Sequence, residues 1–306
     1  MKVFAVLIAS LLPLALAGPA VLKTSALAPA VFNGVTYTPV SSFPANVPED
    51  QKAAIVAADM SIVNLSVNYL RLYSTDGNCA GYALDALATL KSNVKVHIGL
   101  WVADGESRYQ QELTTAVALI KKYPGRVASL SVGNEAIFHT HLPIGTLIGY
   151  INALKANPAV KAANIPVGTF DITPSFVSNP SLVAAVDFIG INIQPDYSNV
   201  PAGSPGSAYA ENFISQFQAF QKEPVIAEAK KPIIVGEVGH ATNDLNAFTN
   251  FFQSTVCLAA KHKINYNYFE FRNAMWKSVV DDKANVQTFG ILTPDTVSKV
   301  RAAIVC

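Results

Sequence analysis

The stretch SLSVGNEAIF (residues 129–138) runs apolar and β-prone up to Val132 and then places a carboxylate, Glu135, directly after Gly133 and Asn134. Apolar and β-branched runs bounded by turn residues predict buried strands. An ionised carboxylate buried without a partner costs free energy, so stability alone would not select Glu at the end of such a strand. The stretch therefore predicts a buried strand that ends at a functional rim.

Runs of this kind recur along the chain and give eight candidate strands. They cover residues 33–40, 68–74, 94–102, 127–135, 165–171, 187–194, 232–239 and 265–272. The segments between them have the apolar spacing of helices, and strands that alternate with helices predict right-handed βαβ units and a parallel sheet. Eight units without an obvious linker predict a single-domain (β/α)8 TIM barrel. The alternative is an open nucleotide-binding sheet, but no Gly-rich phosphate turn follows the first strand.

Composition agrees with one well-packed unit. Of the 306 residues, 51% are hydrophobic and 14% charged, and the net charge is +1. The basic residues are scattered, which argues against a nucleic-acid groove or a polybasic membrane patch. A neutral substrate fits this charge better, and we expect a monomer without a nucleic-acid partner.

The first residues, MKVFAVLIASLLPLALA, combine a basic start, an apolar run and a small-x-small end. This pattern predicts a secretory signal peptide over residues 1–17 and a mature barrel over residues 18–306. The tail has no lipid-anchor signal, so we expect an extracellular or cell-wall protein without a membrane anchor.

Three cysteines in an oxidising compartment leave one unpaired. A bridge between Cys257, late on the seventh helix, and Cys306, at the end of an eighth, is the favoured pairing, with Cys79 as a free thiol. Three unpaired thiols are the alternative.

In a (β/α)8 barrel the chemistry gathers at the carboxyl ends of the strands. Acidic residues occur near five of these ends: Glu135, Asp171, Asp196, Glu237 and Glu270. Glu135 and Glu237 close strongly apolar strands that lie across the barrel mouth from each other. Two convergent carboxyl groups in different environments are what acetal cleavage requires, one with a raised pKa to protonate the leaving oxygen and one to attack. A helix-capping role is the alternative for each.

Six motifs together resemble glycoside hydrolase family 17, especially its fungal cell-wall members. They are SVGNE, PIIVGEVG, LRLYSTDGN, GLWVADGES, VDFIGINIQPDY and FEFRNAMWK. The resemblance implies a retaining endo-1,3-β-glucanase or 1,3-β-glucanosyltransferase that acts on β-glucan without a metal or organic cofactor. It implies that Glu135 is the acid/base, that Glu237 is the nucleophile, and that Asn134 contacts the sugar 2-hydroxyl.

Two departures from the family pattern motivate an alternative function. The family continues from its nucleophile as Thr-Gly-Trp-Pro-Ser, whereas His240 replaces the aromatic residue here, and Ala274 lies where an acidic pair precedes Trp-Lys. The alternative is a carbohydrate-binding wall protein with weak or lost catalysis.

Arg71 and Tyr73 lie two residues apart and share one face of the second strand. If that face is the barrel interior, Arg71 is expected to pair with Glu237 and keep it ionised, while Tyr73 reaches the sugar. Aromatic residues that follow three other strands could stack on sugar rings or simply pack: Trp101, Tyr197 and Trp276.

Glu270 and Lys277 are further substrate-binding candidates, with a surface ion pair as the alternative. Asp171 is expected either to form hydrogen bonds in the cleft or to cap a helix. The pair His139 and His141 forms a His-x-His pattern that could bind a metal ion only together with further ligands, for which His97 and His240 are the candidates. We expect no metal site.

Overall fold

The computed structural model describes residues 32–43, 46–277, 285–293, 295, 297–300 and 304–306. The expected signal peptide, residues 1–17, lies outside the described residues. No helix in the described part of the chain is long and apolar enough to cross a membrane.

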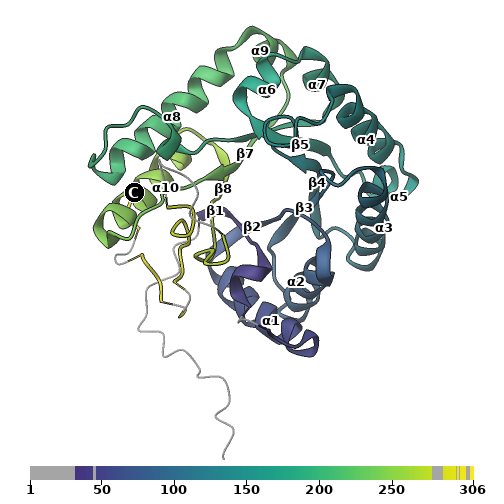
Figure 1. The fold of residues 1–306 in the computed structure, drawn as a ribbon, viewed down its shortest axis with the longest axis horizontal. Helices are drawn as coiled ribbons and strands as arrows, with labels where there is room; N and C mark the ends of the chain where they lie inside the picture. Colours follow the sequence, from purple (N-terminus) through teal and green to yellow (C-terminus); the bar gives the residue numbers. More distant parts are fainter. Residues whose placement is uncertain (1–31, 44–45, 278–284, 294, 296, 301–303) are drawn as a thin grey trace, which may run out of the picture.

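Eight parallel strands form a closed barrel in chain order, as the sequence predicts (Figure 1). Their bounds are β1 Phe32–Thr36, β2 Val67–Leu72, β3 Lys95–Leu100, β4 Val127–Asn134, β5 Val167–Ile172, β6 Phe188–Asn192, β7 Ile233–Val238 and β8 Asn265–Tyr268. The barrel closes where Gly34 of β1 pairs with Asn267 of β8. The eight expected strands are therefore confirmed, each within a few residues of its predicted range.

Helices form a ring around the barrel (Figure 1). The α-helices are α1 Glu49–Ser66, α2 Cys79–Thr89, α3 Glu106–Lys122, α4 Ile144–Ala156, α5 Pro158–Ala162, α6 Thr173–Val177, α7 Pro180–Ala185, α8 Gly206–Lys222, α9 Pro224–Ala229 and α10 Leu245–Lys261. Short 3-10 turns are η1 Pro39–Ser42, η2 Asp76–Asn78 and η3 Pro195–Tyr197.

Helix α8 illustrates how the sequence produces this ring. It buries Tyr209, Phe213, Phe217 and Phe220, and residues three or four apart lie on one face of a helix. This aromatic face packs beside α10, whose first turn is capped by the Asp244 carboxylate on two backbone N–H groups. Helix α8 thus buries one apolar face within the ring of helices.

The C-terminal segment corrects one expectation and confirms another. No helix follows β8 among the described residues, so an eighth helix ending at Cys306 is wrong there. Instead Leu292 forms bridges with Arg272 and Ser298. The Cys257–Cys306 disulfide is nevertheless present, with Cα atoms 5.2 Å apart, and Cys79 is free.

Candidate active site

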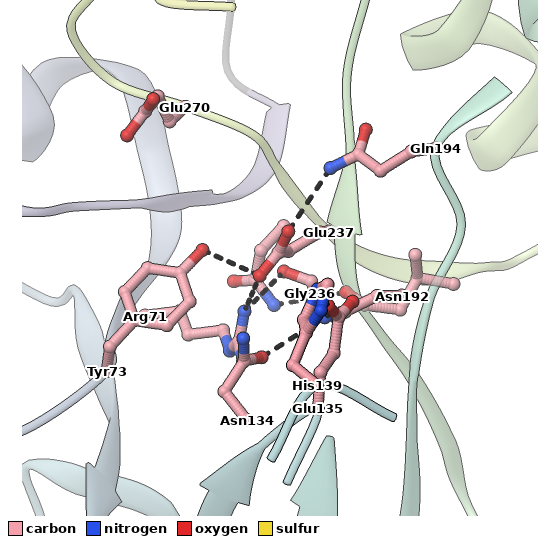
Figure 2. A network of polar contacts seen from close by, with 12 residues as sticks. Arg71, Tyr73, Asn134, Glu135, His139, Asn192, Gln194, Gly236, Glu237 and Glu270 are labelled. Carbon is pink, nitrogen blue, oxygen red and sulfur yellow. Dashed lines mark hydrogen bonds and ion pairs between the residues drawn. The ribbon is translucent and has the colours of Figure 1, made fainter. Parts of the chain in front are cut away.

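Glu237 lies near the carboxyl end of β7, where its side chain enters a network of donors (Figure 2). Its Oε1 accepts hydrogen bonds from Arg71 Nη1 at 3.1 Å and from the Tyr73 hydroxyl at 2.9 Å. Its Oε2 accepts one from Gln194 Nε2 at 3.2 Å. Both carboxylate oxygens of this buried side chain are therefore held in place by three donors. One lies on β2, one just after β2 and one just after β6.

Arg71 is the cation of this network and is only 1% exposed. Its guanidinium lies 3.9 Å from the centroid of the Phe170 ring and 4.5 Å from that of Tyr73. Besides Glu237 it donates to Asn134 Oδ1 at 2.7 Å. The predicted ion pair with Glu237 is present, and its positive charge stabilises the carboxylate in a site that excludes most water.

Glu135 follows β4 and has a left-handed backbone, with φ of 50° two residues after Gly133 at 77°. Such a conformation is costly for a residue with a side chain and tends to occur at functional sites. The turn directs the side chain so that Oε1 accepts from Asn192 Nδ2 at 2.8 Å and Oε2 lies 2.8 Å from His139 Nε2. Glu135 therefore does not act as a helix cap.

The protonation of Glu135 differs from that of an ordinary carboxyl. Burial, followed by the negative charge of Glu237, raises its pKa to about 7. Two neighbouring carboxyl groups thus have opposite environments: Glu135 retains a proton near neutral pH, whereas Glu237 is paired with Arg71. This contrast is the arrangement that general acid catalysis beside a nucleophile requires.

A cavity of about 740 Å³ opens over both carboxyl groups. Its wall combines polar groups with apolar and aromatic ones, among them Phe138, Tyr197, Phe269 and Phe289. Tyr197 is 39% exposed, so its ring can contact a ligand. Aromatic faces beside carboxyl and amide groups suit a sugar, which has apolar ring faces and a polar edge.

Three members of the network were not predicted as site residues: Asn192, Gln194 and His139. Asn192 also donates to Asn134 Oδ1 at 3.1 Å, which couples the end of β6 to that of β4. The sequence GINIQ carries a signal for two of them, because residues two apart at a strand end point the same way.

Two of the predicted aromatic residues are not among the described residues that line this cavity. Within the described part of the chain, its wall includes neither Trp101 nor Trp276. Trp276 is 55% exposed and donates its indole N–H to the Oγ of Ser41, a residue of η1, at 2.9 Å. Tyr73, expected to reach the sugar, donates its hydroxyl to Glu237 Oε1 at 2.9 Å.

Glu270 and Lys277 form an ion pair with Nζ and Oε1 2.9 Å apart. The alternative of a surface pair is wrong for Glu270, which is 1% exposed; Figure 2 shows it apart from the main network. Burial raises its pKa to about 7. Lys277 lines the cavity and lies 4.5 Å from the Phe269 ring, so it can meet a ligand.

Asp171 does not bind in the cleft, which corrects one of the two roles considered for it. The residue is 0% exposed. Its Oδ1 accepts from the Ile172 N–H and the Ser175 hydroxyl, and its Oδ2 accepts from the Ile137 N–H at 3.0 Å. The carboxylate therefore joins the start of α6, through the Ser175 hydroxyl, to the loop that follows Glu135, and it accepts from no backbone N–H group of α6 itself.

His240, which replaces the expected aromatic residue, does not face the cavity. It is buried, with Nδ1 2.7 Å from Asp196 Oδ1 and its ring stacked 4.2 Å from that of Tyr209. His97 lies inside the barrel, 2.7 Å from Ser129 Oγ. Among the residues that the structure describes, no three His, Cys, Asp or Glu side chains are grouped to hold a metal ion.

Comparisons with known proteins agree with this geometry. The sequence model of the BtgE/BtgC glycoside hydrolase domain matches residues 34–290. A protein of Aspergillus niger named as a glucan endo-1,3-β-glucosidase is 26% identical over 81% of this chain, which spans 39% of that relative's length. The glucan 1,3-β-glucosidase of Schizosaccharomyces pombe is 24% identical over 76% of this chain and 75% of its own length.

Solved structures share the fold at low sequence identity. A β-1,3-glucanosyltransferase active-site mutant of Rhizomucor miehei, bound to laminaritriose, has a TM-score of 0.72 at 18% identity over 90% of this chain and 98% of its own. An endo-laminarinase from Formosa has a TM-score of 0.68 at 18% identity, covering 86% of this chain and 84% of its own.

Proposed function

The chain belongs to the BtgE/BtgC glycoside hydrolase family, and from this premise we propose that it is a retaining β-1,3-glucan-active enzyme. The observation that carries the proposal is the contrast between Glu135, whose pKa is raised to about 7, and Glu237, which is paired with Arg71. The names of its relatives, which include glucan endo-1,3-β-glucosidases, support β-1,3-glucan as the substrate.

In the first step Glu135 gives its proton to the glycosidic oxygen while Glu237 attacks the anomeric carbon. A glycosyl ester forms on Glu237, and the aglycone leaves as an alcohol. Arg71 and Tyr73 hold the attacking carboxylate in orientation through its Oε1. Asn134 accepts from Arg71 and Asn192 through Oδ1, which leaves its Nδ2 amide group to donate to the sugar 2-hydroxyl.

In the second step Glu135, now a carboxylate, removes a proton from the acceptor, and the acceptor oxygen displaces Glu237. Water as acceptor gives hydrolysis, as in an endo-1,3-β-glucanase. A sugar hydroxyl gives transfer, as in a 1,3-β-glucanosyltransferase. The exposed rings of Tyr197 and Phe138 on the cavity wall provide surfaces on which an acceptor sugar can stack.

The proposal includes the place of action. A signal peptide over residues 1–17 would direct a mature domain of residues 18–306 to the extracellular space or the cell wall, acting there as a monomer. The near-neutral net charge of +1 suits an uncharged polysaccharide.

The experiment is incubation with laminari-oligosaccharides, followed by analysis of product lengths. Shorter products indicate hydrolysis and longer ones transfer, and Glu237→Gln should abolish both. Binding without any product would overturn the proposal in favour of a carbohydrate-binding wall protein. The carboxyl pair and its donors are all in place, which favours the enzyme.

A further inference from the structure

The imidazole of His139 lies against the carboxyl group of Glu135, 2.8 Å from Nε2 to Oε2 (Figure 2). The other oxygen, Oε1, is occupied by the Asn192 amide at the same distance. His139 is 65% exposed at its side chain, whereas that of Glu135 is 14% exposed. The imidazole therefore connects a largely buried carboxyl group to solvent.

The loop after β4 holds His139 in this position. Its backbone N–H donates to the Glu135 carbonyl at 2.8 Å, which closes a turn between the two residues. Asp171 anchors the same turn through the Ile137 N–H, and the Phe138 ring packs against the imidazole with centroids 4.6 Å apart. The contact is thus built into the loop by several independent bonds.

We propose that His139 is a positioning residue that shares a proton with Glu135 and so sets the pH range over which the acid/base works. This inference rests on the proposed function of Glu135. Figure 2 shows His139 directed at the carboxyl group, and His139 also lines the cavity in which the leaving group would lie.

The charged groups around Glu135 set its pKa before any effect of the His139 imidazole is considered. Glu237 and Asp171 disfavour the carboxylate, whereas Arg71 favours it, and burial is the largest cause of the raised pKa. A carboxyl group and an imidazole in hydrogen-bond contact compete for one proton, so each changes how readily the other releases it. The pair then holds one proton to a higher pH than Glu135 would alone.

The shared proton serves both steps of the reaction. A neutral imidazole accepts a hydrogen bond from protonated Glu135 and so favours the acid form. A protonated imidazole stabilises the carboxylate that remains after Glu135 has protonated the leaving oxygen. The acceptor returns a proton to Glu135 in the second step, so no proton is gained or lost over the cycle.

The test is the pH dependence of kcat/KM on laminari-oligosaccharides for the parent protein, His139→Gln, His139→Arg and His141→Gln. In His139→Gln the alkaline limb should move down by about half to one pH unit, because the amide does not titrate. In His139→Arg it should move down further, since a fixed cation favours the carboxylate. His141→Gln is the matched control from the same loop and should leave the limb in place.

The order of the alkaline limbs in the parent protein, His139→Gln and His139→Arg distinguishes proton sharing from a merely structural role. A uniform loss at every pH, or the same limb in the parent and His139→Gln, would overturn the inference while the proposed function stands. A parent protein that yields no product at any pH would instead overturn the proposed function.

A second measurement does not depend on turnover. The carboxyl ¹³C resonance of Glu135, followed against pH, should show two steps in the parent protein and one in His139→Gln. A single step with the same midpoint in both proteins would overturn the pairing.

Discussion

Replacing Arg71 by Met removes the buried cation that three strands of the barrel share. The guanidinium contacts Glu237 on β7 and Asn134 on β4 from its place on β2. Methionine keeps the apolar stem of Arg71 and loses the guanidinium that lies 3.9 Å from the centroid of the Phe170 ring, so the loss of volume is small. The substitution therefore isolates the loss of charge from the loss of volume.

The magnitude follows from what each partner retains. Asn134 Oδ1 keeps its bond from Asn192, and Glu237 keeps those from Tyr73 and Gln194. Glu237, which is only 7% exposed, loses the positive charge of the guanidinium that balances its own charge. Breaking a buried pair by removing one partner costs about 3–5 kcal/mol. At roughly 2–4 °C per kcal/mol, Tm should fall by about 6–20 °C.

Thermal melting at pH 7 measures this loss in Arg71→Met, in Arg71→Met with Glu237→Gln, and in Arg126→Met. The double variant should recover part of the Tm, because it leaves no unpaired buried charge. Arg126 bonds two backbone carbonyls, of Ser92 and Val94, and its variant should lose only about 1–2 kcal/mol. Equal losses in Arg71→Met and Arg126→Met, or no recovery in the double variant, would refute the reasoning.

Three further predictions concern catalysis, pH and the disulfide. Glu135→Gln should lower kcat/KM on laminari-oligosaccharides by about 10²–10⁴-fold but affect an activated aryl glucoside less; equal losses on both substrates would argue against a general acid. Burial raises the pKa of Glu270 to about 7 from 4.5, so the folded state binds the proton more tightly and stability falls as pH rises through this window. Between pH 4.5 and pH 8, Glu270→Gln, which leaves Lys277 in place, should reduce the decrease in the free energy of unfolding by about 3 kcal/mol, as measured by denaturant unfolding. The same decrease in the parent protein and the variant would contradict this. The bond between Cys257 and Cys306 spans 49 residues, and its removal by Ser substitution at both positions should cost about 4 kcal/mol. A Tm unaffected by the double substitution would exclude that contribution.

The strands could be predicted because each carries its own signal. A buried strand in a parallel barrel is an apolar run with turn residues at both ends, and β6 and β7 have this form most clearly. The same local logic locates Glu135, Glu237 and Arg71, since a charged residue inside an apolar strand needs a partner and the topology brings strand ends together.

The predictions that were wrong concern the contacts of side chains that lie at or beyond the ends of the strands. Asp171 turns toward the backbone of the β4 loop, and Glu270 is buried under a C-terminal segment that has no helix among its described residues. Such outcomes depend on loop paths, which the local pattern does not encode. The sequence marks His139 only as part of a His-x-His pattern, because nothing in it shows that the turn brings His139 back onto Glu135.

The stereochemistry of the first product tests the central claim most directly. Time-resolved ¹H NMR of laminari-oligosaccharide cleavage resolves the anomer of the new reducing end before mutarotation. If Glu237 forms a glycosyl ester that water attacks with help from Glu135, the β-anomer must appear first, and Glu237→Gln must yield none. The α-anomer as first product would contradict the account.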